Sequence, residues 1–183
     1  MSNPPQQKSE GLPASFADAG ITVTPATLDD VEAIETIERD CYSTPWSRET
    51  LAFELLDANI VSLVARYSGA THFPNAGHRQ VASQTLDIVG YTFMRHGFGE
   101  GHIENIAVAP AAQGRGIASY LMEALLAWAE ANALTSIMLE VRQGNRAAMT
   151  LYYKYGFKIE GYRRAYYKDP PEDAVLMRLN LEE

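Results

Sequence analysis

Apolar residues recur along this chain with two spacings, one typical of helices and one typical of strands. Thr27 can cap a helix, and Pro45 interrupts the apolar pattern that follows it. Ser47 can cap a second, short helix that runs to about Asp57. The apolar positions of the first helix follow a three-to-four-residue period and are Val31, Ile34, Ile37 and Cys41. The segment after residue 26 is therefore predicted to hold two consecutive helices.

Short runs rich in β-branched and aromatic residues predict the strands. The expected strands are Ile21–Pro25, Ile60–Arg66, Asp87–Arg95, His102–Val108, Ser136–Arg142, Phe157–Arg163 and Asp173–Leu179. A third helix is expected after Gly116, and a fourth over Asn145–Tyr155, ended by Gly156. The apolar positions of the third helix are Ile117, Leu121, Leu125 and Trp128. Strands in hairpin order followed by strands alternating with helices predict a mixed α/β sheet.

The remaining segments have the composition of irregular chain. Residues 1–20 are rich in Pro, Gln, Ser and Gly and are predicted to form a disordered tail. Ser68–Gln84 is rich in Gly, His and Ser and is predicted to be a long loop. Residues 21–183 then form one domain, a size that can bury a substantial core. No apolar run is long enough to cross a bilayer, and the first residues lack the order of a secretory signal.

Composition places the chain among globular proteins, with 46% hydrophobic and 21% charged residues. A single cysteine, Cys41, rules out an internal disulfide framework and fits the reducing cytoplasm. The four histidines show no ligand spacing, so no metal is expected.

Charge is distributed unevenly along the chain, whose formal net charge is −8. Residues 1–60 hold 11 acidic and 3 basic side chains, whereas residues 141–168 hold seven basic side chains and Glu160 alone as an acid. The basic segment indicates either a locally bound polyanionic ligand or an ordinary solvated face. A nucleic-acid partner is disfavoured because the rest of the surface would repel it.

A glycine-containing turn follows the strand that ends at Val108. Gly114 and Gly116 allow a tight turn whose N–H groups approach a ligand, and the helix that begins there adds free N–H donors. This combination suits a pyrophosphate, although a purely structural turn remains an alternative. A Walker loop is excluded because Ile117 follows Gly116, and a dinucleotide fingerprint is excluded because Ser119 stands near the place of the third glycine.

Two further positions carry candidate chemistry. Asn145 and Tyr152 are two helical turns apart and share a face with Ala148, which leaves room for a ligand between an amide and a phenol. The alternative is a capping Asn and a half-buried Tyr. Glu140 stands between Leu139 and Val141 in an apolar strand, either on the solvated face or with a chemical task.

These segments together resemble the RimI-type enzymes of the GNAT superfamily of N-acetyltransferases, over about residues 21–179. The motifs that carry the resemblance are Gln113-x-x-Gly116-x-Ala118, Leu139-Glu140-Val141-Arg142-Gln143-Gly144-Asn145, Asn145-x-x-Ala148-x-x-Leu151-Tyr152, Pro45-Trp46-Ser47 and Arg163-Arg164-Ala165-Tyr166-Tyr167-Lys168. The resemblance implies a mostly antiparallel central sheet that splays in a V between two central parallel strands, flanked by about four helices.

The resemblance also implies acetyl-CoA as cosubstrate, bound in the V. Its thioester carbonyl would be held by backbone N–H groups near Ile106–Val108. The implied cosubstrate-binding residues are Ile106, Ala107, Val108, Gln113, Gly114, Arg115, Gly116, Ile117, Ala118, Ser119 and Asn145.

Catalytic roles follow from the same resemblance. Tyr152 would protonate the departing thiolate, and Glu140 would take the proton of the substrate amine. Glu104 is a rival base in the preceding strand, and strict alternation would place it on the face of Ile106 and Val108. The implied substrate-side residues are Glu104, Pro45, Trp46, Tyr166 and Tyr167.

The implied reaction is direct acetyl transfer in a ternary complex to the N-terminal amine of a protein, with Ala or Ser first, on a ribosomal protein. An α-amine, with an ordinary pKa of about 7.7–8.0, demands a weaker base than a lysine at about 10.4. The alternatives are acetylation of a small-molecule amine or a lysine side chain, and a CoA- or nucleic-acid-binding module without turnover. The presence of Glu140 and Tyr152 argues against the last of these.

Overall fold

The computed structural model describes residues 20–67 and 88–181 of the chain. The tail predicted over residues 1–20 falls almost wholly outside this part of the chain, and the loop predicted at Ser68–Gln84 lies outside it too. The described strands are β1 Ile21–Pro25, β2 Ile60–Tyr67, β3 Ile88–Gly97, β4 Glu100–Val108, β5 Ser136–Arg142, β6 Lys158–Lys168 and β7 Pro171–Asn180. The described α-helices are α1 Val31–Cys41, α2 Arg48–Leu56, α3 Ile117–Ala131 and α4 Arg146–Lys154.

Local capping chemistry explains where the first helices begin. The Asp30 carboxylate accepts the Thr27 N–H at 2.8 Å, so Thr27 starts a short 3-10 turn that leads into α1. The Ser47 hydroxyl accepts the N–H of Thr50 at 3.2 Å and begins α2. Gly156, with φ of +86°, follows the end of α4. The predicted cap at Ser47 and the predicted helix end are confirmed, whereas Thr27 begins the 3-10 turn and Asp30 stands at the start of α1 itself.

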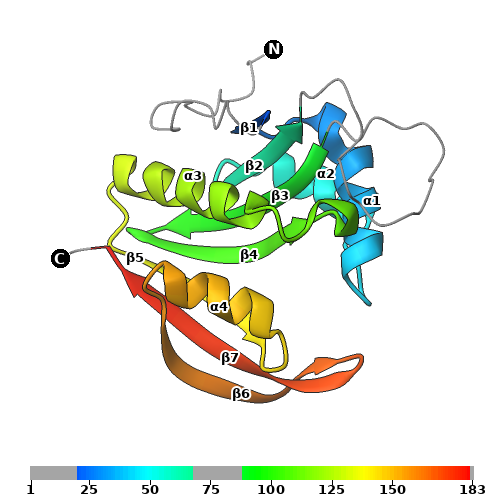
Figure 1. Cartoon of the computed structure of the whole chain (residues 1–183). Helices are drawn as coiled ribbons and strands as arrows, with labels where there is room; N and C mark the ends of the chain where they lie inside the picture. The colour runs from blue at the N-terminus through cyan, green and yellow to red at the C-terminus, as the bar shows by residue number, and fades with distance from the viewer. Residues whose placement is uncertain (1–19, 68–87, 182–183) are drawn as a thin grey trace.

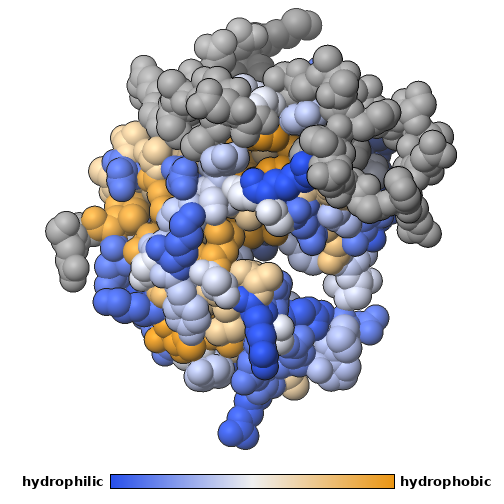
Figure 2. All heavy atoms as spheres, viewed as in Figure 1, coloured by the Kyte–Doolittle hydropathy of each residue, from blue (hydrophilic) through white to orange (hydrophobic). Residues whose placement is uncertain are grey.

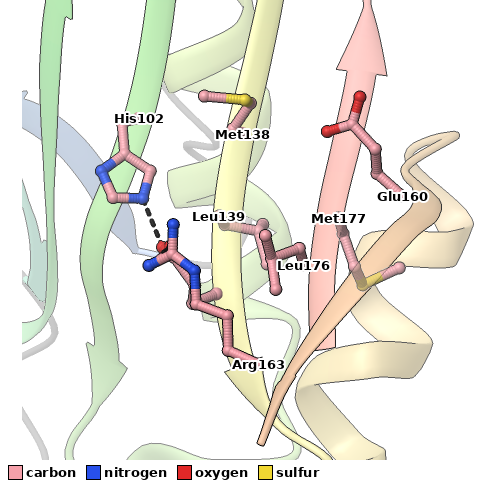
Figure 3. Close-up of a pocket in the computed structure, with 8 residues that line it drawn as sticks. His102, Met138, Leu139, Glu160, Arg163, Leu176 and Met177 are labelled. Atoms are coloured by element: carbon pink, nitrogen blue, oxygen red, sulfur yellow. Dashed lines mark hydrogen bonds and ion pairs between the residues drawn. The ribbon is translucent and has the colours of Figure 1, made fainter. Parts of the chain in front are cut away.

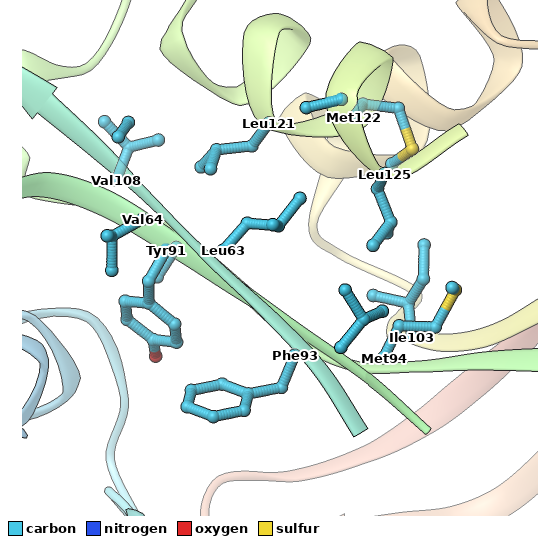
Figure 4. Packing of buried hydrophobic residues seen from close by; sticks show 14 of the residues in the cluster. Leu63, Val64, Tyr91, Phe93, Met94, Ile103, Val108, Leu121, Met122 and Leu125 are labelled. Atoms are coloured by element: carbon cyan, nitrogen blue, oxygen red, sulfur yellow. The ribbon is translucent and has the colours of Figure 1, made fainter. Parts of the chain in front are cut away.

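The strands form one seven-stranded sheet in the order β1-β2-β3-β4-β5-β7-β6. Helices α3 and α4 cover one face of the sheet, and α1 and α2 cover the other (Figure 1). On the α3 face, Val108 and Ile103 pack with Leu121 and Leu125, whereas the rings of Tyr91 and Phe93 lie on the opposite side (Figure 4). The mixed α/β fold predicted from the strand and helix order is confirmed.

The sheet opens between its two parallel strands. β4 and β5 pair only from Glu100 with Ser136 to Ile103 with Leu139, and all other neighbouring strands are antiparallel. Beyond this last pair the two strands diverge, so the second half of β4 faces a gap rather than a strand (Figure 1). Glu104 and Glu140 are the first residues past the last pair, and both stand at the vertex of the resulting V.

One expectation about side-chain direction is wrong. The β3–β4 register shifts at Phe93 and Met94, which pair with Asn105 and Ile103, so Glu104 is an extra residue in β4. The bulge places Glu104 on the α1–α2 face, where it meets Arg95, instead of on the α3 face with Ile106 and Val108. Strict alternation fails here because a bulge resets the two-residue period.

Within the described residues, no helix combines the length and apolar character that crossing a membrane requires.

Candidate active site

The splayed half of β4 offers backbone donors to the gap. Ala109 donates its N–H to the Val89 carbonyl at 2.9 Å, so residues 109, 107 and 105 direct their backbone groups at β3. The backbone groups of Ile106 and Val108 consequently point the other way, into the V. An extended acyl chain lying in the V could accept hydrogen bonds from these N–H groups much as a further strand would.

The carbonyls of the same two residues are already engaged by side chains. The Tyr42 hydroxyl donates to the Ile106 carbonyl at 2.9 Å, and the Gln113 side-chain amide donates to the Val108 carbonyl at 3.0 Å. The Cys41 thiol also lies 3.4 Å from the Val108 carbonyl. Side chains from the end of α1 and from the glycine turn therefore hold this edge of β4 open for a ligand.

The glycine turn leaves space in front of α3. Gly114 and Gly116 have φ values of +74° and +80°, which glycine adopts at little cost. A Cβ built at either position would meet no other described heavy atom within 4 Å. The ammonium of Lys154 lies 3.3 Å from the Ser119 hydroxyl in the first turn of α3 and adds positive charge to the helix N-terminus. These features fit a pyrophosphate.

Replacing Gly116 with Val tests this assignment. We expect acetyl-CoA at 100 times its Kd to raise the free energy of unfolding of the wild-type protein by about 2.7 kcal/mol, and therefore to raise its Tm. The variant should lose this rise in Tm. Gly99→Val is the matched control, because Gly99 also has a positive φ, of +82°, and its Cβ would meet other atoms only at 3.9 Å. Retention of the full shift in Gly116→Val would mean that the turn does not hold the pyrophosphate.

The N-terminus of α4 places a second polar group beside the V. The Asn145 side-chain oxygen accepts the N–H of Ala148 at 3.1 Å, which confirms Asn145 as the helix cap. Its amide nitrogen is a donor that can reach a ligand while the oxygen caps the helix. The capping interpretation is thus confirmed, and the ligand-binding one stays a prediction.

Tyr152 is buried rather than half-buried, with 5% of its surface exposed. Its ring lies 5.7 Å from the ring of Phe157. Burial, followed by the neighbouring Tyr167 phenol, raises the pKa of Tyr152 well above its ordinary value of 10. The phenol therefore keeps its proton at neutral pH and is available as a donor.

Tyr42 is a site residue that sequence reasoning missed. Its pKa is raised well above the ordinary value by burial and then by Glu38, with a smaller contribution from Tyr152. Tyr42 directly follows α1 and Tyr152 lies on α4, so two phenols come from helices on opposite faces of the sheet. The only sequence signal was a tyrosine directly after the last apolar position of the first helix.

Glu140 lies at the vertex of the V with two partners. His102 Nε2 is 2.5 Å from Glu140 Oε2, and an Arg163 guanidinium nitrogen is 2.8 Å from Oε1. The three residues line a pocket on the α1–α2 face, together with apolar residues of β5 and β7 (Figure 3). Sequence reasoning singled out Glu140 but not His102, whose partner is 38 residues away in the chain.

Glu104 belongs to a different cluster at the same vertex. Arg95 contacts Glu104 at 2.8 Å, and its other nitrogens contact Glu54 and Asp57 of the α2 region at 2.7 Å each. One guanidinium therefore serves three carboxylates. Burial and the charge of Glu104 raise the pKa of Glu54.

The hairpin between β6 and β7 reaches the segment that follows α1. Arg142 donates to the carbonyls of Asp169 and Pro170 at 2.8 and 3.0 Å, and its guanidinium lies 4.2 Å from the centre of the Tyr167 ring. The Ser43 hydroxyl donates to the Asp169 carbonyl at 2.6 Å. Figure 2 shows an indentation between these two segments at the edge of the molecule.

The remaining substrate-side candidates border this edge. The Trp46 N–H donates to buried Glu38 at 3.0 Å, and its ring lies 5.7 Å from that of Phe93. Pro45 precedes it in an exposed position. The Tyr166 ring packs edge-on against Tyr167 at 5.1 Å. The structure therefore brings Pro45, Trp46, Tyr166 and Tyr167 to two segments that meet at the opening of the V.

Among residues 20–67 and 88–181, no three potential ligand side chains lie close enough together to hold a metal ion.

A sheet splayed between two parallel strands, with a glycine turn at one side, a carboxylate at its vertex and a phenol on the helix beside it, is the architecture of an N-acetyltransferase. The family model for "Acetyltransferase (GNAT) family" matches residues 31–157, and the chain belongs to that family. Members of this family use acetyl-CoA as the acetyl donor.

Individual relatives narrow the comparison. The chain is 29% identical over 163 residues to the [Ribosomal protein bS18]-alanine N-acetyltransferase of Escherichia coli K12, covering 86% of this chain and 96% of the relative. It is 29% identical over 155 residues to the protein of the same name from Haemophilus ducreyi, covering 83% and 94%. The crystal structure of the Escherichia coli ribosomal-protein-S18-alanine N-acetyltransferase superposes with a TM-score of 0.73 at 27% identity, covering 89% and 95%. The resemblance to RimI-type enzymes is confirmed.

Proposed function

We propose that this enzyme transfers the acetyl group of acetyl-CoA to the N-terminal amine of a protein, with an N-terminal Ala or Ser of a ribosomal protein as its substrate. The observation that carries the proposal is the placement of Glu140 and Tyr152 at the vertex and side of the V. The names of the relatives, which act on the alanine of ribosomal protein bS18, support the substrate class. The single cysteine and a ribosomal substrate support a cytoplasmic location.

The contact between Ser43 and Asp169 supports a chain end over an internal lysine. It joins the segment after α1 to the β6–β7 hairpin, which Arg142 holds in place. The opening of the V is thereby bounded on both sides by polypeptide. An extended N-terminus can enter such an opening end-on, whereas a lysine within a folded protein would have to bring its own backbone past both segments.

Different residues around the V would bind different parts of acetyl-CoA. Gly114, Gly116 and the N–H groups at the start of α3 would hold the pyrophosphate, with Asn145 donating from α4. The N–H groups of Ile106 and Val108 would hold the acyl arm and its carbonyl. Negative charge that develops on that oxygen during transfer would be stabilised by the same fixed donors.

Two side chains move protons. Glu140 accepts the proton that the amine loses as its nitrogen bonds to the acetyl carbon. Tyr152 gives its proton to the sulfur as the carbon–sulfur bond breaks. A phenol whose pKa is raised by burial remains protonated until that moment, and solvent restores its proton afterwards.

Incubation with acetyl-CoA and a library of N-terminal peptides, read by mass spectrometry, tests the proposal. We expect an acetyl group on the α-amine of peptides that begin with Ala or Ser, and unmodified peptides when the α-amine is blocked. Acetylation confined to lysine side chains, or to polyamines and aminoglycosides offered in parallel, would contradict the proposal that the substrate is a protein N-terminus. Binding of acetyl-CoA without any acetyl transfer would show that the protein is a CoA-binding module and not an enzyme.

A further inference from the structure

His102 and Glu140 form a directly bonded pair at the vertex of the V. Their polar atoms are 2.5 Å apart, and Arg163 occupies the other carboxylate oxygen at 2.8 Å. An ionised carboxylate can only accept hydrogen bonds, so a neutral imidazole at this distance presents its Nε2–H to Glu140. The lone pair of His102 is then on Nδ1, where a further proton can bind.

The two members of the pair differ in their access to solvent. The side chain of Glu140 is 14% exposed and that of His102 is 40% exposed. His102 lines the pocket on the α1–α2 face, with the imidazole pointing toward Glu140 and Arg163 (Figure 3). A proton that reaches this pair therefore has its more open path to water through the imidazole.

We propose that His102 and Glu140 accept the amine proton as one unit, with His102 as the proton-sharing, positioning residue of Glu140. This inference rests on the proposed function. One N–H bond of the amine breaks as the nitrogen bonds to the acetyl carbon, and the pair passes from a net charge of −1 to 0. Since their polar atoms are only 2.5 Å apart, the proton can move between the two partners before it leaves to solvent through the more exposed His102.

The two members of the pair belong to side-chain types of different ordinary basicity. An isolated carboxyl group ordinarily titrates near pH 4.3, an imidazole near 6.5 and an α-amine at about 7.7–8.0. General-base catalysis is most effective when the base is free at the working pH and still close to the donor in pKa. The imidazole therefore adds to the site a group whose ordinary basicity lies closer to that of the substrate amine.

Other charges face this pair from every neighbouring strand. Arg95 pairs across from His102 on β3, and it is neutralised by Glu104, Glu54 and Asp57. On the outer strands, Arg163 of β6 bonds Glu140, and Arg178 of β7 bonds Glu160 and Glu100. The Tyr167 phenol of β6 also interacts electrostatically with Glu140. Of these groups, Glu54 has a raised pKa and could itself affect the rate in acid.

The decisive variant is His102→Gln, which keeps an N–H donor for Glu140 but cannot take up a proton near neutral pH. We expect kcat/KM for an N-terminal Ala peptide to fall about 10-fold or more at pH 7. We also expect the acidic limb of the pH–rate profile to move about 1 pH unit or more toward acid, since a carboxyl group alone then titrates. The Kd of acetyl-CoA, measured by titration, should stay unchanged.

Two control variants isolate the effect. His96→Gln removes an imidazole of β3 that lies outside the site, with its ring 4.8 Å from the Trp128 ring. This variant should leave the pH–rate profile unchanged. Glu54→Gln removes the other group that could shape the acidic limb, and should leave the limb in place. Displacement of the limb by Glu54→Gln instead of by His102→Gln would assign it to the Arg95 cluster and overturn the proposal.

The other outcomes are equally clear. An unchanged rate and limb in His102→Gln would remove His102 from proton transfer. A lower rate with the limb unmoved would reduce His102 to a structural contact and also overturn the proposal. Both results require an active wild-type enzyme, so they are distinct from failure of the proposed function, in which the wild type acetylates no α-amine.

Discussion

Glu140→Gln should lower kcat/KM for an N-terminal peptide by about 10²–10⁴-fold at neutral pH, because the amide cannot take the proton of the amine. The rate should recover in part as the pH rises past about 8, where the α-amine is already neutral. The acidic limb of the wild-type pH–rate profile should disappear, because His102 acts through Glu140 and does not itself meet the amine. Steady-state rates across the pH range, with the acetyl-CoA Kd as a check on folding, measure all three effects.

Glu104→Gln is the matched control for this prediction, because Glu104 is the corresponding first residue past the last β4–β5 pair. Its carboxylate shares Arg95 with Glu54 and Asp57, so its loss leaves that guanidinium with two partners. We therefore expect the smaller loss of rate in Glu104→Gln. A larger loss there than in Glu140→Gln would move the base to β4.

The order and type of the elements could be predicted because their signals are local. The caps at Ser47 and Asn145 and the glycine after α4 each act within four residues in the chain. Strand β6 is longer than expected, since Tyr167 and Lys168 pair with Glu172 and Pro171 of β7 beyond a register shift. The apolar pattern of that segment alone gave no such signal.

The contacts that complete the site are non-local and could not be predicted. His102 reaches Glu140 across 38 positions, and Tyr42 reaches Ile106 across 64. The bulge at Glu104 depends on how β3 aligns with β4, and no single residue marks it. Motif resemblance supplied Glu140 and Tyr152, whereas the partners that tune them became visible only once the strands were aligned.

Buried Glu38 is another residue whose non-local contacts could not be predicted from the sequence. It accepts hydrogen bonds from Tyr91, Asn105 and the Trp46 backbone, and thus ties α1 to β3, β4 and the segment before α2. In the sequence it occupies an unremarkable helical position among other acidic residues. Burial raises the pKa of Glu38, and the three donors oppose that rise. Its place between Trp46 and Asn105 links the substrate side of the site to the strand that borders the V.

Tyr152→Phe should lower kcat by about 10²–10⁴-fold while the Kd of acetyl-CoA changes little, because only the proton donor is removed from a ring that stays buried against Phe157. The raised pKa of Tyr152 adds a prediction about pH. Since the folded enzyme holds the phenol protonated beyond its ordinary pKa of about 10, the wild-type rate should show no falling limb from this group up to pH 10.

Tyr153→Phe is the matched control, one residue away on an exposed side of α4, and should leave kcat unchanged. Single-turnover rates for both variants decide the matter. An undiminished chemical step in Tyr152→Phe would assign protonation of the thiolate to another group, and Tyr42, whose hydroxyl bonds the Ile106 carbonyl, would be the next phenol to test.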